Sequence, residues 1–410
     1  MAANKQINQK KSSLFDTSAL TRETTAILNS FDEIIQGVRP LNSRQLQQLT
    51  ENIRNLSHQL TDDRASRRLG YMNDNIQLSS YVRYYTWWNL VRLTRLFANI
   101  PASVFPTADC TCLDLGSGPL TVVTALWLAR PELRKLKLTW YCLDVSANSM
   151  ALGEDIYLSI AAKAKATDES IEPWHIVRVK GPFGTQIKQK AGFLTCANMF
   201  NELDQASDMP PEFQTKKYYE QLTRYTEKDA GILLVEPGVP KAARTLSLLR
   251  TRYIKDGRTI AAPCPHAEEC PMSGFKAYTG SKNKWCNFAF STEDAPARLQ
   301  KLSVAAKLPK ERATLSFMAV APCHAELDSA STDTTTIRIT SDKLRLPNYM
   351  CGYYGCSQHG LVLVTLPDEN NTRLPKPPFR PQSGDLISVK TKRPDSLPKD
   401  EKSGALIIKL

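Results

Sequence analysis

Four cysteines in the second half of the chain have the residue type and the setting of a metal site. They lie in three separate stretches and are Cys264, Cys270, Cys286 and Cys356. Thiolates are soft ligands that select zinc or iron–sulfur clusters. A proline follows each of the first two cysteines, which stiffens the loop and removes a backbone donor. The sequence therefore predicts one metal centre whose ligands come from separate loops.

The spacing of these cysteines favours an iron–sulfur cluster over zinc. Zinc sites usually pair cysteines about two to four residues apart, whereas here 5, 15 and 69 residues separate successive cysteines. Each corner iron of a cluster takes one thiolate, so ligands from separate loops are acceptable. Zinc stays open on spacing alone, and so do four unrelated buried cysteines, because free cysteine is often a small core residue. His266, in the same loop, is either a ligand or a donor to a sulfur or backbone group.

Composition excludes several classes of protein. The chain has 410 residues, 42% hydrophobic and 23% charged, which is typical of a soluble protein of two or three domains. Its ten cysteines are too few for a disulfide scaffold, and neither a signal peptide nor about 18 consecutive apolar residues are present. We therefore expect a reducing cytoplasm. The net charge of +12 indicates a polyanionic partner, of which nucleic acid is the commonest.

A glycine turn in the middle of the chain predicts a nucleotide site. Residues 111–115 form a strand that runs into Gly116 and Gly118, and Asp144 ends the next strand. Glycines at such a turn let a ligand approach the backbone, and a carboxylate that ends the next strand can accept both hydroxyls of a ribose. A dinucleotide site fits less well, because its third glycine would fall at Thr121. A tight turn without a ligand is the other alternative.

The elements around this turn predict an α/β fold. Strands and helices alternate from Cys110 onwards, which implies a parallel, doubly wound sheet. A cysteine loop over residues 263–287 interrupts the alternation, and residues 287–290 and 315–321 are expected to complete the sheet as an antiparallel edge pair. The expected strands cover residues 111–115, 137–143, 175–179, 192–199 and 231–235, and the helices cover 121–129, 147 onwards, 218–225 and 241–255.

Different patterns flank this core, which we place at residues 101–322. Residues 1–18 are polar and predicted to be disordered, residues 19–100 to be helical, and residues 323–410 to form a small β module with a basic tail. A helix over residues 79–97 carries dense aromatic side chains, a pattern typical of core. Arg83, Arg92 and Arg95 between them are candidates for a phosphate-facing edge.

Several motifs together resemble a known family. Asp-Leu-Gly-Ser-Gly-Pro, over residues 114–119, looks like motif I of class I S-adenosylmethionine (SAM)-dependent methyltransferases. Its combination with five other motifs resembles the mitochondrial small-ribosomal-subunit assembly methyltransferase-like family and its bacterial homologues, over roughly residues 70–365. Those motifs are Asn-Met-Phe-Asn-Glu-Leu (198–203), Glu-Pro-Gly (236–238), Cys-Pro-His with Cys-Pro-Met (264–272), Trp-Cys-Asn-Phe (285–288) and Cys-Ser-Gln-His-Gly (356–360).

The resemblance implies a class I methyltransferase fold, a [4Fe–4S] cluster and association with small-subunit rRNA and the precursor of the small subunit. It assigns Cys264, Cys270, Cys286 and Cys356 as cluster ligands, with Cys351 as the alternative fourth ligand. It assigns SAM binding to Asp114, Gly116, Ser117, Gly118, Asp144 and Asn198. Leu120 departs from the family, in which many members have a third glycine there; this leucine either crowds the cofactor or packs beneath it.

These observations lead to two functional hypotheses. The first is a ribosomal small-subunit assembly factor that binds rRNA, with the cluster stapling the C-terminal module to the core and with little or no catalysis. The second is an active SAM-dependent rRNA methyltransferase, although neither an Asn-Pro-Pro-Tyr motif nor a cysteine nucleophile is found. A radical SAM enzyme fits poorly, because it needs three closely spaced cysteines and an open iron.

Overall fold

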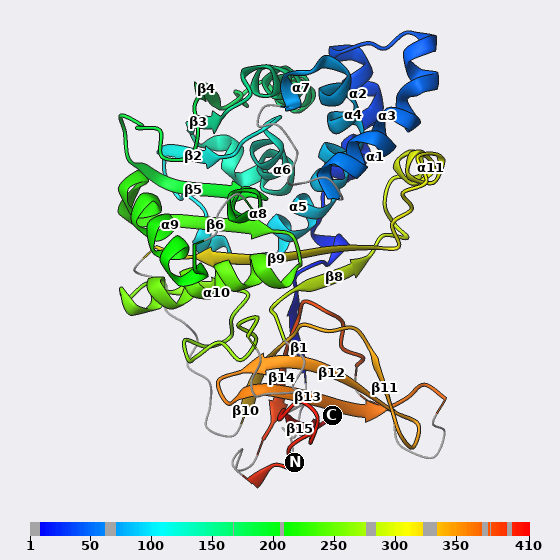
Figure 1. The fold of residues 1–410 in the computed structure, drawn as a ribbon, viewed down its shortest axis with the longest axis vertical. Helices are drawn as coiled ribbons and strands as arrows, with labels where there is room; N and C mark the ends of the chain where they lie inside the picture. Colours follow the sequence, from blue (N-terminus) through cyan, green and yellow to red (C-terminus); the bar gives the residue numbers. More distant parts are fainter. Residues whose placement is uncertain are drawn as a thin grey trace.

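The protein consists of two parts, a large α/β core and a smaller β module, which lies below the core in the view of Figure 1. The computed structural model describes residues 9–61, 71–166, 168–205, 209–275, 284–322, 334–370, 376–377, 379–391 and 396–410. In this part of the chain no helix is both long and apolar enough to cross a membrane.

The core is built on an eight-stranded sheet in the order β4-β3-β2-β5-β6-β9-β7, with β8 paired to β9. The first five strands along the chain are parallel, and β9 is antiparallel to β6, β7 and β8. The strand order reverses between β2 and β5, which is the place where open α/β sheets bind their ligands. This topology confirms the predicted class I methyltransferase fold, including the antiparallel edge pair. The strands are β2 (Thr111–Leu115), β3 (Thr139–Asp144), β4 (His175–Lys180), β5 (Ala191–Ala197), β6 (Thr226–Glu236), β7 (Ile260–Ala262), β8 (Phe288–Ser291) and β9 (Arg312–Val320).

Helices cover both faces of this sheet, and each face has its own hydrophobic cluster. Successive strand residues point to opposite faces, so Cys112 packs with one cluster and Leu113 with the other. One face carries α5 (Trp87–Asn99), α6 (Thr121–Ala129) and α7 (Ala147–Lys165), and the other carries α8 (Phe200–Gln205), α9 (Pro211–Tyr225) and α10 (Pro240–Lys255). Shorter helices are η5 (Ala102–Val104), η6 (Pro131–Lys135) and α11 (Ala297–Ala305).

The N-terminal region is helical, as predicted, and packs on the first of these faces. The aromatic helix is continuous but contains one π-helical turn, a feature that is frequent at functional sites. Its Tyr84, Trp87 and Trp88 are buried, so the aromatic side chains are core. The helices are η1 (Thr17–Ala19), α1 (Arg22–Asn29), α2 (Phe31–Val38), α3 (Ser43–Thr61), η3 (Tyr71–Asn73), α4 (Asn75–Tyr81) and the π turn η4 (Val82–Thr86).

The expectation that Arg83, Arg92 and Arg95 form a phosphate-facing edge is wrong. Their exposed fractions are only 5%, 9% and 6%. Their guanidinium groups bind partners far away in the sequence, such as the Thr314 carbonyl for Arg92 (3.0 Å) and the Asp294 carboxylate for Arg95 (2.6 Å). Arg92 and Arg95 hold the helical region to the core, and Arg83 donates to Gln36 and the Arg39 carbonyl inside the helical region. None of the three is available to an external phosphate.

The C-terminal module is a seven-stranded sheet in the order β1-β14-β10-β12-β13-β15, with β11 paired to β12. The predicted disorder of residues 1–18 is wrong for residues 9–18, because β1 pairs with β14 and η1 follows; residues 1–8 lie outside the described part. The first strand of the chain thus belongs to the last module (Figure 1). The strands are β1 (Gln9–Ser13), β10 (Thr334–Ile339), β11 (Leu344–Leu346), β12 (Met350–Ser357), β13 (Gly360–Pro367), β14 (Asp385–Lys390) and β15 (Leu406–Lys409).

Candidate cofactor pocket and cysteine centre

The glycine turn lies at the carboxyl end of β2, beside the reversal of strand order. Gly116 and Gly118 have φ angles of +64° and +48°, which favour glycine. Leu120 also has a positive φ, and its side chain is fully buried in the core. The leucine therefore packs beneath the turn and does not crowd the face where a cofactor would lie. Ser117, the remaining residue assigned to this turn, is 4% exposed and donates to the Asp114 carbonyl (2.8 Å).

Asp144 ties the end of β3 to this turn. Its Oδ2 accepts the Gly118 N–H (2.9 Å) and its Oδ1 accepts the Ser146 N–H (2.8 Å). Burial raises the pKa of Asp144, while these two backbone hydrogen bonds act to lower it. Each carboxylate oxygen keeps a further lone pair, so the group can still accept hydroxyls from a ribose.

Asp114 lies deeper, inside the sheet. It is fully buried, and its Oδ1 accepts the Thr195 hydroxyl (2.7 Å). No hydrogen-bond partner for Oδ2 is found among the described residues. The carboxyl group supports the turn from below.

Asp114 should give the protein a pH-dependent stability. Burial raises its pKa from 3.8 to about 7, so the folded state binds the proton more tightly than the unfolded state. The free energy of unfolding then falls as the pH rises from about 4 to about 7. Asp114→Asn keeps an acceptor for Thr195 and carries no charge, so its free energy of unfolding should not fall in this way. Relative to the unmodified protein, we expect the variant to be ~2–4 kcal/mol more stable at pH 8 than it is at pH 4.5. Urea unfolding at both pH values measures this, and parallel profiles for the two proteins would contradict it.

Asn198 follows β5, the strand next to β2 in the sheet. Its φ of 60° is unusual for a side chain other than glycine. Its Oδ1 accepts a hydrogen bond from Arg92 (3.1 Å), which also donates to Asn89 (2.9 Å). The buried arginine thus positions Asn198, a role that the sequence reading missed because it treated this arginine as exposed.

Two methionine side chains lie over the glycine turn. A methyl group added to Gly116 would lie 3.0 Å from Met199 Cβ and 3.4 Å from its sulfur, and one added to Gly118 would lie 3.8 Å from Met72 Cε. The Ser149 hydroxyl donates a hydrogen bond to the sulfur of Met72 (3.6 Å). The face that a cofactor would use is therefore lined closely by the chain itself.

Glu236, of the Glu-Pro-Gly motif, has a structural role beside this pocket. It is fully buried, and its two oxygens accept the N–H groups of Phe200 (2.9 Å) and Asn201 (3.0 Å). These are N–H groups at the start of α8, where a negative charge is favourable. Glu202 lies in the first turn of α8, and its charge raises the pKa of the Tyr81 hydroxyl.

The four cysteines of the predicted metal centre converge between the core and the C-terminal module. Burial raises the pKa of Cys286 well above its ordinary value, and the neighbouring thiols of Cys356, Cys270 and Cys264 raise it further. Cys264, Cys270 and Cys286 also line one cavity of about 30 Å³. Three of these thiols thus come from the core side, and the fourth comes from β12.

Within the described residues, no three or more His, Cys, Asp or Glu side chains form a group that could hold a metal ion.

Two buried arginines face the four thiols from opposite sides of the joint. Arg250 of α10 donates to Cys264 Sγ (3.1 Å) and to the His266 carbonyl (2.8 Å). Arg338 of β10 is 6% exposed, donates to the Pro263 carbonyl (2.9 Å) and interacts electrostatically with Cys356. A buried guanidinium requires a negative partner, so this pair suits an anionic thiolate centre.

Cys351 and His266 differ from the four cysteines. Cys351 lies on β12, five residues before Cys356, so its side chain is on the opposite face, within the hydrophobic cluster of the module. The charged groups that act on it are Lys343, Arg380 and Asp368 and include no cysteine. Burial lowers the pKa of His266 to about 4, so its ring is neutral at pH 7. Cys323 lies outside the described residues.

Comparison with known proteins gives one family. A family model described as the mitochondrial small ribosomal subunit Rsm22 matches residues 92–341. A search of curated proteins found no match to the chain.

SAM-dependent methyltransferases are among the solved structures similar to the chain. The enzymes from Geobacter sulfurreducens and Thiobacillus denitrificans, both in complex with S-adenosyl-L-homocysteine, are each 12% identical and match 57% of this chain and 90% of their own, with TM-scores of 0.31 and 0.32. CalO1, a methyltransferase of calicheamicin biosynthesis, is 14% identical over 73% of this chain and 71% of its own, with a TM-score of 0.31.

Proposed function

Since the chain belongs to the Rsm22 family of the mitochondrial small ribosomal subunit, we propose that it is an assembly factor of the small ribosomal subunit that binds rRNA. A [4Fe–4S] cluster held by Cys264, Cys270, Cys286 and Cys356 staples its two parts together. The observation that carries the proposal is the convergence of these four thiols, with Arg250 and Arg338, at the joint between core and module. The protein would act as an assembly factor in the cytoplasm, which is reducing and contains ribosomes.

The donor set fits such a cluster. Four soft thiols meet in a buried place, and two guanidinium groups offset the negative charge of the thiolates. A closed set of four protein ligands is structural, so the bound group would contribute folding energy and no reactive position. The alternative is a zinc site with the same ligands. Protein purified without oxygen would be brown and hold about four irons if the cluster is right, and colourless with one zinc if it is wrong.

The residue types around the glycine turn also suit SAM, which would supply a methyl group for transfer. Asp114, Gly116, Ser117, Gly118, Asp144 and Asn198 surround the turn at the reversal of strand order. Asp144 would accept the ribose hydroxyls, and the bare glycines would admit the ligand to the backbone. An active rRNA methyltransferase is therefore the second candidate, favoured by this intact turn. Met72 and Met199 over the glycines favour the first candidate, in which catalysis is weak or absent.

Replacing Met199 with alanine should reveal whether this side chain restricts the pocket. Because its Cβ and sulfur lie over Gly116, a ligand must displace the side chain before it reaches the backbone. We expect Met199→Ala to bind SAM ~3–10-fold more tightly by calorimetry. Met209→Ala, which removes an exposed methionine beyond α8, is the control and should change nothing. Weaker binding by Met199→Ala would show that Met199 holds the ligand instead.

RNA binding tests the proposed function directly. Lys180, Lys188 and Lys190 are exposed around the edge strand β4 and the segment after it, and we assign them to phosphate contacts. The logarithm of the affinity should fall linearly with the logarithm of salt concentration, by ~0.7–0.9 per phosphate neutralised. Alanine at all three positions should lower that slope by about two to three.

The matched control replaces Lys165, Lys216 and Lys343, which each pair with a carboxylate at 2.6, 3.9 and 2.8 Å. Removing these already neutralised charges should leave the slope nearly unchanged. Immature small subunits should bind more tightly than an arbitrary duplex, since phosphates alone carry no sequence information. The assembly-factor assignment would be overturned if the RNA affinity did not depend on salt concentration. It would also be overturned if the protein did not co-sediment with small-subunit particles.

A further inference from the structure

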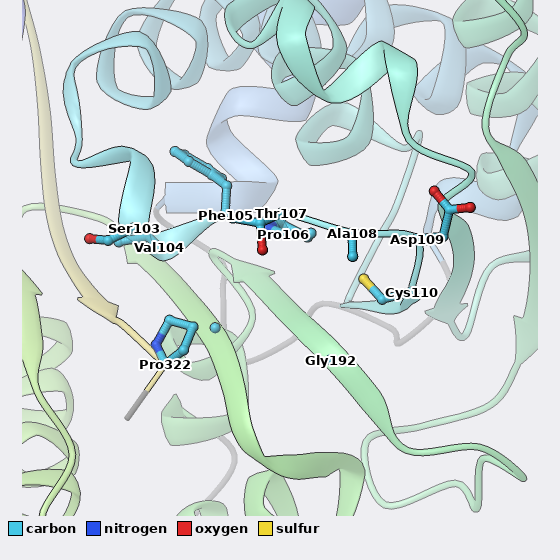
Figure 2. Close-up of a pocket in the computed structure, with 11 residues that line it drawn as sticks. Ser103, Val104, Phe105, Pro106, Thr107, Ala108, Asp109, Cys110, Gly192 and Pro322 are labelled. Carbon is cyan, nitrogen blue, oxygen red and sulfur yellow. The ribbon is translucent and has the colours of Figure 1, made fainter. Parts of the chain in front are cut away.

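A second cavity lies at the amino ends of the parallel strands, opposite to the glycine turn. It has a volume of about 390 Å³. Residues 103–110 form one side, and Pro322 and the strand that carries Gly192 lie across from them (Figure 2). Most of its lining is apolar, including Val104, Phe105 and Pro106. The function proposed above uses none of these residues.

A pair of thiols lies at the edge of this cavity. Cys110 lines it and is partly exposed, whereas Cys112 on β2 is fully buried behind it. The two sulfurs are 3.8 Å apart, because Cys110 directly precedes β2 and residues two apart in extended backbone share a face. Hydrogen bonding from Cys112 lowers the pKa of Cys110, whereas burial raises the pKa of Cys112 well above its ordinary value. A partly exposed thiol that lines the cavity thus has a second thiol within reach.

We propose that Cys110 and Cys112 are a reversible redox-modification site that reacts with peroxides. The Cys110 thiolate attacks one oxygen of hydrogen peroxide, the O–O bond breaks, and the leaving hydroxide takes a proton to become water. Cys110 is then a sulfenic acid. The Cys112 sulfur attacks the Cys110 sulfur, the S–O bond breaks, and a second water leaves as the disulfide forms. Two electrons pass from the two thiols to the peroxide.

A bond between Cys110 and Cys112 would join residues two apart in extended backbone at the start of β2. Residues two apart in a strand have Cα atoms about 6.4–6.8 Å apart, near the upper limit for a disulfide. A strained disulfide has a more oxidising potential, which is typical of labile, regulatory bonds. Since β2 continues into Asp114 and the glycine turn, closure of the bond would act on the strand that supports the cofactor pocket.

Peptide mapping of the full-length, metal-loaded protein tests the proposal. The protein is treated with one equivalent of hydrogen peroxide, alkylated and digested with trypsin, which leaves Cys110 and Cys112 in one peptide without other cysteines. We expect this peptide to lose about 2 Da, to escape alkylation and to recover both thiols after dithiothreitol. Cys196, fully buried on β5, is the internal control and should not be oxidised. Iron content, followed in parallel, should not change.

Two variants separate the roles of the thiols. In Cys112→Ser the reaction should stop at the sulfenic acid of Cys110, which a dimedone adduct detects. In Cys110→Ser the remaining buried Cys112 should stay reduced. The proposal is overturned if the unmodified protein keeps both thiols reduced at one equivalent of peroxide, if it accumulates the sulfenic acid without the disulfide, or if Cys112 reacts in the absence of Cys110.

Discussion

Cys356→Ser should lose its iron and release the C-terminal module from the core. Cys356 is the one thiol of the four that β12 supplies, whereas the other three lie between β7 and β8. Removing it opens the centre and leaves Arg250 and Arg338 buried beside fewer negative charges. Closed metal sites contribute on the order of 10 kcal/mol of folding energy, so a loss of several kcal/mol is expected. Iron analysis, absorbance and limited proteolysis between core and module measure the outcome.

Cys351→Ser is the matched control for this experiment. It changes the same residue type on the same strand, but its side chain lies on the other face and packs inside the module. It should keep about four irons per chain. If Cys351→Ser loses the iron and Cys356→Ser keeps it, the fourth ligand has been assigned to the wrong residue.

Asp144→Ala should weaken SAM binding about 10–100-fold, or ~1.4–2.8 kcal/mol. The carboxylate has two tasks here, since it accepts the N–H groups of Gly118 and Ser146 and would also accept the ribose. Its removal both loosens the glycine turn and takes away the acceptor for the ligand. Calorimetric titration with SAM measures the change.

The control for Asp144→Ala is Asp155→Ala, which removes an exposed carboxylate from α7. It should leave the affinity unchanged. Unaltered binding by Asp144→Ala would contradict the assignment of the ribose acceptor. No binding by the unmodified protein would show that the pocket has lost its ligand and would leave only the assembly-factor hypothesis.

Local patterns sufficed to predict the parallel core. β2, at Thr111–Leu115, and the strands that follow it have apolar runs broken by turn residues, so their order along the chain implied the sheet. The strand β12 was not predicted, although it carries Cys356. Its two glycines interrupt the apolar pattern, and cross-strand side chains fill their places: a methyl group on Gly355 would lie 2.6 Å from Ile337, and one on Gly352 would lie 2.9 Å from Leu363.

Long-range contacts account for the expectations that were wrong. Arg92 and Arg95 look like surface residues by type, but carbonyl and carboxylate groups more than 100 residues away receive their hydrogen bonds. The strand β1 is polar throughout, and its pairing with β14 stabilises it in place of an apolar face. Neither kind of contact leaves a local periodicity that a sequence reading can detect.

The pairing of β1 with β14 also has a consequence for the order of events during synthesis. Ser13 is paired with Asp385, and Lys10 forms an ion pair with the same aspartate (2.8 Å). Contacts between such distant parts of a chain form slowly, because the whole intervening loop must close first. The strand β1 must therefore wait, unpaired, until the distant strand β14 has been translated. Over that interval its lysines and serines keep an exposed strand edge soluble.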